Sequence, residues 1–532
     1  MKNILRTTGG LLAALLLFSQ CQDDFLDVAN PNEIDAKNFF QTMSDLDLVL
    51  TSVYSAQKTQ ELYGADFLPK VSYGLPKTAN QDWLGTNGWN QMYRNEVTPE
   101  NDLIDNFWQG FYRGVARAND FLTNVDQFVE ENQATLTPEN LARIEEMRGE
   151  ARYWRAFDYF HLIRLWGEKM PALDPSAAGV PLILEIPATR EEMAVSRATV
   201  GQVYEQIIAD LLAAEAALPD SWEGPDLARV DAFAAKATLA EVYMNFNDYA
   251  AANGYLEEIV NDGSFSLVPF EDYQDLFNGE NEFSSESLLE INFSTDLQEN
   301  MWQGGLGTNL ALQIAPKGTG WSNVYPHDVN VLRFGDDPRL RVNMLEPGVD
   351  SVVFGDGKWK ILEPMVGDEG ALGWSFKKYV PIEYSVYSTN RNFGANVLVY
   401  RLAGAYLMYA ETQNALGNDD VALDYLNRVR RRAYGGDPTT PSAEADLTGL
   451  AGDALRDAIY EERFLELFAE GHRWYDIIRW GIAEEEIAKY PTVRSGPVLF
   501  NPERDYYFPI PQAELDNNPN IRQSTGYGGD GG

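Results

Sequence analysis

The sequence contains very few of the residues that usually carry covalent or metal chemistry. Its 532 residues include one cysteine, Cys21, and three histidines, His161, His327 and His472. A single cysteine excludes an internal disulfide framework, a CxxC redox centre and a zinc site built on cysteines. The histidines lie far apart in the sequence and no HExxH motif occurs, so a zinc enzyme is not expected.

Basic residues are scarce relative to acidic ones. The chain has 41 Lys and Arg against 81 Asp and Glu, a formal net charge of −40. Such a negative field repels phosphate backbones and anionic lipid surfaces, which excludes non-specific nucleic-acid binding and a polybasic membrane contact. The many carboxylates could supply oxygen ligands, so calcium is the one cofactor that the composition leaves open, although no EF-hand spacing is present.

Long apolar runs are also absent. The longest apolar run near the N-terminus, residues 11–18, is too short to cross a membrane as a helix. It follows Lys2 and Arg6, and residues 1–20 therefore read as a signal peptide. The run ends directly before Cys21 in a pattern that resembles a bacterial lipobox, which predicts lipidation of Cys21. An incidental thiol is the alternative.

Helical periodicity is present over most of the remaining chain. Apolar residues recur at helical spacing in seven regions: 36–60, 105–128, 138–166, 198–217, 231–261, 401–432 and 453–480. Thr137 and Pro138 suit the start of the third region, and Gly167 suits its end. The intervening segments 64–101 and 263–394 are rich in turn residues and aromatics, and they predict long loop-rich insertions with minor β structure.

An internal repeat indicates how these helices pack. Residues 240–259 align without gaps on residues 410–429, and each segment reads as a helix, a short polar turn and a second helix. Small alanines recur where the two helices must approach closely. This pattern is typical of a tetratricopeptide-type hairpin, so the sequence predicts a mainly α fold built as a superhelix of helical hairpins.

The segment from Glu461 to Trp480 contains carboxylates and a histidine that could suggest acid–base catalysis. His472 and Asp476 lie four residues apart on one helix face. The segment is also rich in Ile, Leu, Phe and Trp, and three pairs at i, i+3 spacing suit ion pairs: Arg463–Glu466, Glu470–Arg473 and Asp476–Arg479. A structural role is therefore favoured, and no catalytic residue is predicted.

Aromatic side chains within the insertions are the functional candidates. Sugar rings present flat C–H faces and a rim of hydroxyl groups, so their sites pair aromatic platforms with amide and carboxylate side chains. Five residues stand among such neighbours and are predicted to include glycan contacts: Trp83, Trp89, Tyr93, Trp302 and Trp321. The alternative for each is a place in a local hydrophobic core.

Motifs from end to end give the chain a family resemblance. They include Cys21 … Phe25-Leu26-Asp27, then Ile459-Tyr460-Glu461-Glu462-Arg463 … Gly471-His472-Arg473-Trp474-Tyr475-Asp476, and Tyr507-Phe508-Pro509-Ile510-Pro511 … Asn518-Pro519. The chain resembles the SusD/RagB family of outer-membrane nutrient-binding lipoproteins. On this resemblance the domains are a linker at 21–35, a SusD-like domain at 36–525 with helices at about 105–262 and 395–481, and a Gly-rich tail at 526–532.

The resemblance also implies a function. Family members bind an oligosaccharide, or in some cases a peptide, at the cell surface and pass it to a TonB-dependent SusC-like transporter in the outer membrane, without catalysis. The acidic composition favours a neutral glycan, although Lys317, Lys377 and Lys378 lie near Trp321 and Trp374 in the sequence. Peptide cargo and, less favoured, a surface glycoside hydrolase with two carboxylates are the alternatives.

Overall fold

The computed structural model describes residues 40–81, 87–295, 306–366, 371–389 and 392–528. It forms two compact units, residues 1–46 and 47–532. In the described part of the first unit, the Asp45 carboxylate accepts hydrogen bonds from the backbone N–H groups of Gln41 and Thr42 (3.0 and 2.8 Å), where helix α2 (Met43–Gln57) begins. The predicted signal peptide, Cys21 and most of the linker lie outside the described residues.

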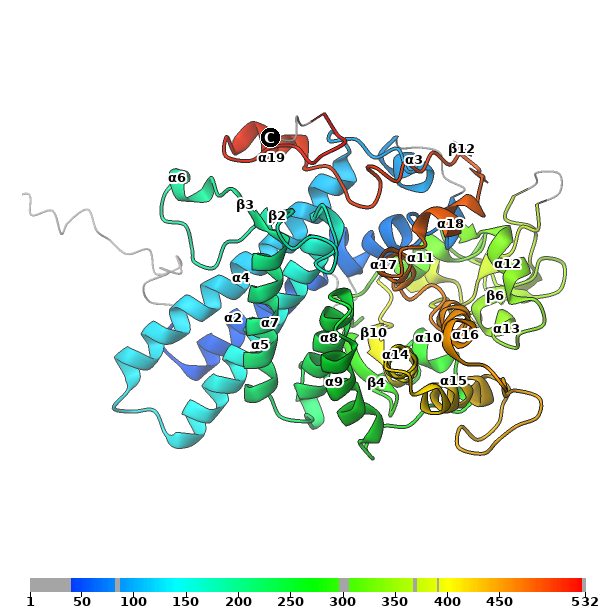
Figure 1. Ribbon diagram of the computed structural model, residues 1–532, viewed down its shortest axis with the longest axis horizontal. Helices are drawn as coiled ribbons and strands as arrows, with labels where there is room; N and C mark the ends of the chain where they lie inside the picture. The colour runs from blue at the N-terminus through cyan, green and yellow to red at the C-terminus, as the bar shows by residue number, and fades with distance from the viewer. Residues whose placement is uncertain (1–39, 82–86, 296–305, 367–370, 390–391, 529–532) are drawn as a thin grey trace, which may run out of the picture. The chain divides into compact units, whose positions relative to one another are not determined.

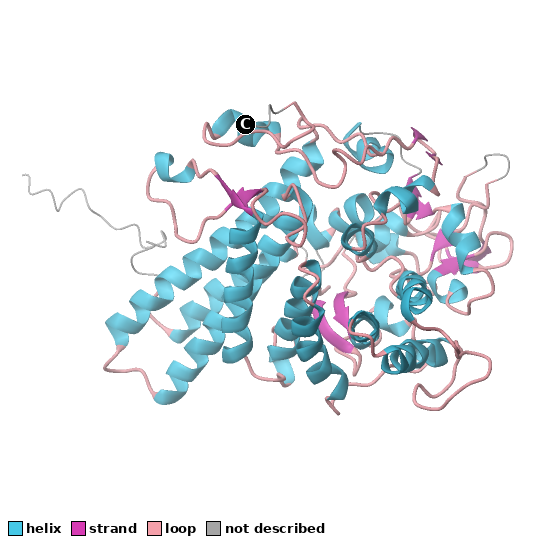
Figure 2. Ribbon diagram, viewed as in Figure 1, coloured by secondary structure: helices cyan, strands magenta, loops and turns pink. Residues whose placement is uncertain are grey.

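Antiparallel helices packed in sequence order form the scaffold of the second unit (Figures 1 and 2). The long helices are α4 (Asp102–Asn132), α5 (Pro138–Trp166), α7 (Val200–Ala217), α8 (Ala232–Asn245), α9 (Tyr249–Asn261), α14 (Leu402–Ala415), α15 (Asp419–Ala433) and α16 (Gly452–Glu466). Each packs against the next, and α9 packs against α14 although the large insertion separates them in sequence. The predicted mainly α superhelix of hairpins is confirmed.

Helix boundaries follow from side-chain caps. The Thr137 hydroxyl accepts a hydrogen bond from the Asn140 backbone N–H at 3.2 Å, and the Asn140 side chain accepts from the Thr137 backbone N–H at 3.3 Å. This reciprocal capping box and Pro138 in the first turn begin α5 at the predicted residue, and the chain leaves the helix at Gly167. Thr199 caps α7 in the same way with Gln202.

The internal repeat corresponds to the hairpins α8–α9 and α14–α15. Ala240 and Ala410 are fully buried at equivalent places, as the close approach of two helices requires. The turns also match, since Asn247 and Gly417 occupy equivalent positions and both have a positive φ, 56° and 82°. The predicted helix–turn–helix repeat is therefore confirmed at the level of single turn residues.

The first insertion contains more regular secondary structure than the sequence predicts. Residues 64–101 hold the end of the π-helical turn η3 (Gln60–Gly64), all of η4 (Phe67–Ser72), strand β1 (Ala79–Gln81) and helix α3 (Asn87–Arg94). Short helices therefore interrupt the predicted loop region, which holds for the rest of this segment. Trp89, Met92 and Tyr93 follow helical spacing and are buried, and this face holds α3 in place.

The second insertion consists of short elements. Its described strands pair only in twos, and β5 and β4 find their partners outside it. The pairs are β5 (Val324–Pro326) with β1, β4 (Ser287–Ile291) with β10 (Val397–Arg401), β6 (Met344–Leu345) with β9 (Ser375–Phe376) and β7 (Ser351–Val353) with β8 (Trp359–Ile361). Its helices are α10 (Asp275–Asn278), α11 (Leu310–Ile314), α12 (Asp328–Phe334) and α13 (Leu340–Asn343). Outside it, β2 (Ala178–Pro181) pairs with β3 (Arg197–Thr199) and β11 (Thr492–Val493) with β12 (Gly496–Pro497).

The helix predicted over 453–480 is broken. Helix α16 ends at Glu466, and α17 (Arg473–Arg479) begins after a turn in which Ala469 and Gly471 have positive φ angles of 62° and 97°. At Gly471 a Cβ atom would lie 3.1 Å from the Leu68 side chain, so the turn also approaches the first insertion closely. The remaining short helices are α6 (Arg190–Met193), α18 (Ala483–Ala488) and α19 (Gln512–Asn517).

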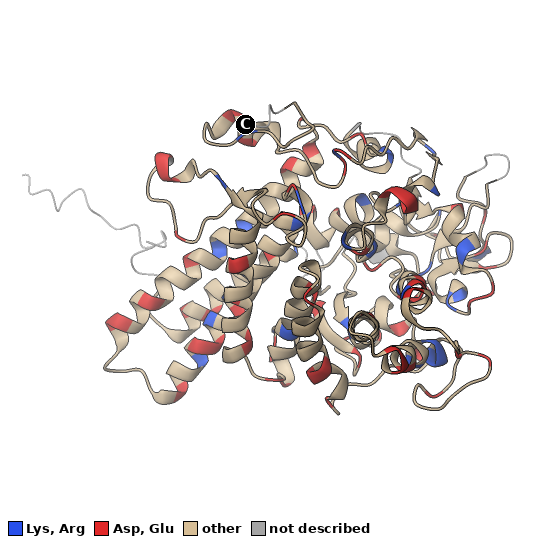
Figure 3. Cartoon of the chain, viewed as in Figure 1, with Lys and Arg blue, Asp and Glu red and all other residues tan. Residues whose placement is uncertain are grey.

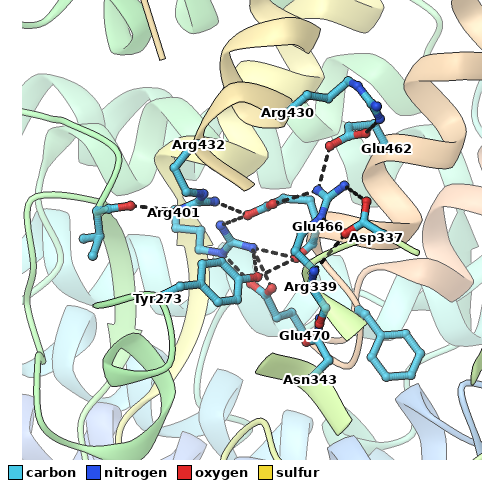
Figure 4. A network of polar contacts seen from close by, with 12 residues as sticks. Tyr273, Asp337, Arg339, Asn343, Arg401, Arg430, Arg432, Glu462, Glu466 and Glu470 are labelled. Carbon is cyan, nitrogen blue, oxygen red and sulfur yellow. Dashed lines mark hydrogen bonds and ion pairs between the residues drawn. The ribbon is translucent and has the colours of Figure 1, made fainter. Parts of the chain in front are cut away.

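Acidic and basic positions are interspersed along the helices (Figure 3), and some meet in a buried network (Figure 4). Five cations and five carboxylates form it: Arg339, Arg401, Arg430, Arg432, Lys378, Asp337, Glu286, Glu462, Glu466 and Glu470. Glu466 is at its centre, since its carboxylate lies 2.6 Å from Arg401, 3.0 Å from Arg339 and also contacts Arg432. The charges balance, as buried ions require.

The ion pairs of α16, α17 and the turn between them differ in part from the local pairs that the sequence predicts. Asp476 and Arg479 do pair, at 2.8 Å. The other two predicted pairs do not form, and their residues pair with more distant ones. These pairs are Arg463–Asp476 (2.9 Å), Glu466–Arg401 (2.6 Å), Glu470–Lys378 (2.7 Å) and Arg473–Glu486 (2.7 Å). Burial raises the pKa of Asp476, but the guanidinium groups of Arg463 and Arg479 outweigh it and lower the pKa to about 2. These contacts are structural, as the sequence predicts for this segment.

Candidate ligand-binding site

Strand pairing brings the two aromatic-rich insertions together. Strands β1 and β5 run antiparallel, with Asn80 opposite Tyr325 and Gln81 opposite Val324. The sequence predicts two separate candidate segments, one around Trp83 and one around Trp321, and Trp321 lies three residues before β5. We refer to Asn80, Asn90, Trp321 and Asn323, which lie on or beside these strands, as the β1–β5 site.

The five predicted contact residues have different surroundings. Trp83 and Trp302 lie outside the described residues. Trp89 and Tyr93 are 1% and 0% exposed, and the Tyr93 hydroxyl donates a hydrogen bond to the Pro69 carbonyl at 2.6 Å. Lys70 covers the Trp89 ring at 4.9 Å from its centroid. Neither ring can stack on a sugar in this arrangement.

Trp321 is the described candidate that remains partly open. It is half-buried and lies three residues before β5. Its backbone N–H donates to the Leu312 carbonyl at 2.6 Å, and the next residue, Ser322, has a positive φ of 53°. The Asn323 backbone N–H donates to the Gln313 carbonyl at 2.7 Å. These bonds to α11 fix the backbone that carries the indole.

A further exposed ring lies close to Trp321, and sequence reasoning missed it. Tyr387 is 45% exposed, and its hydroxyl donates to the Gly320 carbonyl at 2.7 Å. Ser385 makes a parallel contact, since its hydroxyl donates to the Thr319 carbonyl at 2.8 Å. Tyr387 therefore reaches the 317–321 turn from a distant segment, and its local sequence carries no signal for this contact.

Amide groups and the β11–β12 hairpin flank the strand pair. The Asn80 side-chain oxygen accepts from the backbone N–H groups of Gln81 (3.0 Å) and Arg494 (2.8 Å). The Gln81 side-chain amide donates to the Asn90 carbonyl oxygen. These contacts hold the amides in fixed positions beside β1, where they can offer hydrogen bonds to ligand hydroxyl groups.

The cation nearest to β1 in the sequence is buried rather than offered to a ligand. The Lys77 side chain is fully buried, and its ammonium donates to the carbonyls of Gly74 (2.7 Å) and Met92 (3.4 Å). Burial lowers the pKa of Lys77 well below its usual value. The role of Lys77 is to tie the segment before β1 to α3.

Metal ligands do not gather in the part of the chain that the structure describes. No group of three or more His, Cys, Asp or Glu side chains there could hold a metal ion. The β1–β5 site instead combines a partly open indole, an exposed phenol ring nearby and fixed amides, which suits a ligand with apolar ring faces and hydroxyl groups.

The fold defines a class of helical-repeat proteins with large insertions, and the similarity to known proteins specifies the family. The family model described as "SusD family" matches residues 334–527, and the model described as "Starch-binding associating with outer membrane" matches residues 24–244. The chain belongs to the SusD/RagB family.

Individual relatives align with nearly the whole chain. SusD-like protein P25 of Formosa agariphila is 27% identical over 550 aligned residues, which cover 97% of each chain. A laminarin-binding SusD-like protein superposes with a TM-score of 0.72 at 25% identity, covering 92% of this chain and 100% of its own. A SusD-like carbohydrate-binding protein of Bacteroides fragilis superposes with a TM-score of 0.74 at 22% identity, covering 91% and 100%.

Proposed function

We propose that the chain is a cell-surface lipoprotein of the outer membrane that binds an oligosaccharide and passes it to a TonB-dependent SusC-like transporter. The observation that supports the binding function is the pairing of β1 with β5, because Asn80 lies on β1, Gln81 of β1 holds Asn90, and Trp321 lies three residues before β5. Membership of the SusD/RagB family supports the same role, as does the laminarin-binding relative.

The cargo that we propose is a neutral glycan. The net charge of −40 opposes an anionic ligand unless cations gather at the site. Lys378, one of the lysines close to Trp374 in sequence, is fully buried and pairs with Glu470 at 2.7 Å. The Lys377 ammonium donates to the Arg341 carbonyl at 3.2 Å. These two lysines are thus engaged by the protein itself.

A glycan array at physiological salt, with laminarin included, tests the proposal. We expect neutral glycans to bind, and Trp321→Ala to weaken that binding at least about tenfold, which corresponds to about 1.4 kcal/mol. Trp222→Ala is the matched control, because Trp222 is half-buried and its indole N–H donates to the Val230 carbonyl at 2.8 Å, away from this site. Trp83→Ala and Trp302→Ala extend the test to the other loop tryptophans.

The array also discriminates the alternatives. Binding only to uronate or sulfated glycans would overturn the neutral cargo, and binding of peptides without any glycan would replace glycan by peptide. Shortening of a glycan by the pure protein would indicate a hydrolase. Full affinity in all the tryptophan variants would place the site elsewhere.

The lipid anchor is proposed at Cys21. No helix of the described residues is both long and apolar enough to span a membrane. We expect Cys21→Ser to move the protein from the membrane fraction to the soluble fraction of cells, because one acylated cysteine would be its attachment. A variant that stays membrane-bound would refute the anchor, and co-purification with a TonB-dependent transporter tests the partner.

A further inference from the structure

A hollow lies on helix α4, away from the β1–β5 site. It has a volume of about 510 Å³ and lies between α4, the segment 181–187, α6 and the α19 region. Its walls are mainly apolar and include Trp108, Tyr112, Val115, Ile183, Ile186 and Met193. Ile186 and Met193 are 47% and 62% exposed, so the apolar surface continues onto the rim. We call this hollow the α4 groove.

One wall of the α4 groove is a clamped backbone segment. The Tyr159 hydroxyl accepts from the Ile183 backbone N–H at 2.7 Å and donates to the Ile183 carbonyl at 2.8 Å. The Asn119 side-chain amide donates to the same carbonyl at 2.9 Å. Beyond Ile183, the backbones of Leu184, Glu185 and Ile186 form no hydrogen bond with another described residue. The chain bends at Glu185, and the backbone N–H and C=O groups of these residues are open to hydrogen bonds from a docked ligand.

Three carboxylates face the groove without a cation. Asp120, Glu185 and Glu514 line it, and none of them forms an ion pair with another described residue. The one cation among the described lining residues, Arg113, contacts Glu61 instead. Burial raises the pKa of Asp120, which is the response of a carboxylate that lacks a positive partner. A ligand with basic groups would complement this rim.

The polar groups inside the groove argue against a sugar. The Tyr112 hydroxyl donates to the Pro181 carbonyl at 2.7 Å. Both polar groups of the Asn119 side chain are engaged, because its N–H donates to the Ile183 carbonyl and its oxygen accepts from Arg155 at 2.9 Å. Trp108 is only 4% exposed and offers no open platform. An acyl chain would fill the walls but would leave the carboxylates and the backbone of 184–186 without partners.

We propose that the α4 groove docks an extended polypeptide segment of a partner protein, in which apolar side chains alternate with lysine or arginine. The backbone of that segment forms hydrogen bonds with the N–H and C=O groups of residues 184–186, on either side of the bend at Glu185. Its apolar side chains enter between Ile186 and α4, and its cations meet Asp120, Glu185 and Glu514. This docking is independent of glycan binding at the β1–β5 site.

The test uses the full chain and a synthetic octapeptide in which leucine and valine alternate with lysine. We expect binding that weakens at least about tenfold with Ile186→Asp and with Glu185→Lys, and that Leu332→Asp leaves unchanged. Leu332 is the matched control, because it is 70% exposed on α12 and does not line the groove. Ile186 is itself 47% exposed, so its variant should fold, and thermal unfolding checks this.

Two altered peptides test the recognition chemistry. N-methylation of alternate backbone nitrogens should weaken binding at least about tenfold, because it removes the donors that would pair with residues 184–186. Replacement of lysine by glutamate should abolish binding. Glycan affinity should not change in any groove variant.

Several results would overturn the proposal. They are no binding at about 1 mM peptide, equal binding by Ile186→Asp, and equal binding of the glutamate peptide. If the chain forms a dimer that Ile186→Asp dissociates, and no peptide binds, the occupant of the groove would be a second copy of the chain rather than a partner segment.

Discussion

Replacement of Glu466 by glutamine should destabilise the protein far more than the same change elsewhere on α16. Glu466 is fully buried and contacts the guanidinium groups of Arg339, Arg401 and Arg432. Burial alone would raise its pKa, but these three cations outweigh it and hold the pKa well below the usual value. Glutamine keeps the shape and cannot supply the charge.

The magnitude follows from the charge balance of the network. Five cations then face four carboxylates, and an uncompensated buried charge costs about 3–5 kcal/mol. Glu461→Gln is the matched control on the same helix, because the Glu461 side chain is 42% exposed and pairs with Arg333. An exposed pair contributes about 0–1 kcal/mol.

Urea unfolding, monitored by circular dichroism, measures the free energy of unfolding of both variants. Urea is suitable because, unlike guanidinium, it does not screen charges. The free energy of unfolding should fall by about 3–5 kcal/mol for Glu466→Gln and by at most about 1 kcal/mol for Glu461→Gln. Added salt should reduce only the effect of Glu461→Gln, because buried pairs are little screened. Equal losses in the two variants would refute the role given to the network.

Three further predictions concern pH and helix packing. Burial raises the pKa of Asp231 to about 7, so this carboxyl favours the folded state below its unfolded pKa and that contribution is lost as pH rises toward 7. Asp231→Asn, which can still cap α8, should therefore raise the melting temperature more at pH 8 than at pH 5, and an equal change at both would contradict this. Gly114→Ala should lower the melting temperature, because its Cβ would lie 1.9 Å from the Asp158 carboxylate across the α4–α5 contact. Gly254→Ala in α9 should raise it slightly, because nothing lies within 4 Å, and a drop as large as that of Gly114→Ala would refute the packing argument.

Helix boundaries were predictable where local chemistry determines them. Thr137, Pro138 and Gly167 mark both ends of α5, since capping acts within one turn of the chain. Helix α3 was missed because its Gly and Asn residues read as a loop, although Trp89 and Tyr93 already lie at helical spacing. The helical spacing of these apolar residues predicts the helix when it is given more weight than the Gly and Asn residues.

The candidate site was less predictable, because its members meet through long-range contacts. Trp321 was identified from its residue type and neighbours, but nothing local indicates that β1 pairs with β5 or that the Tyr387 hydroxyl reaches Gly320. Charged residues behave in the same way. Arg463 pairs with Asp476 rather than with Glu466 on its own helix, because buried charges select partners by the three-dimensional packing around them.

The buried network also links the helical scaffold to the second insertion. Arg339 and Lys378 belong to the large insertion, yet their partners Glu462 and Glu470 belong to α16 and the turn that follows it. The Tyr273 hydroxyl, from the same insertion, donates to the Glu466 carbonyl at 3.0 Å. These buried contacts thus connect the insertion to the helices. Trp321 lies on a separate turn, which hydrogen-bonds to α11. A substitution of Trp321 should therefore leave the stability of the fold nearly unchanged, whereas a change at Glu466 should lower it.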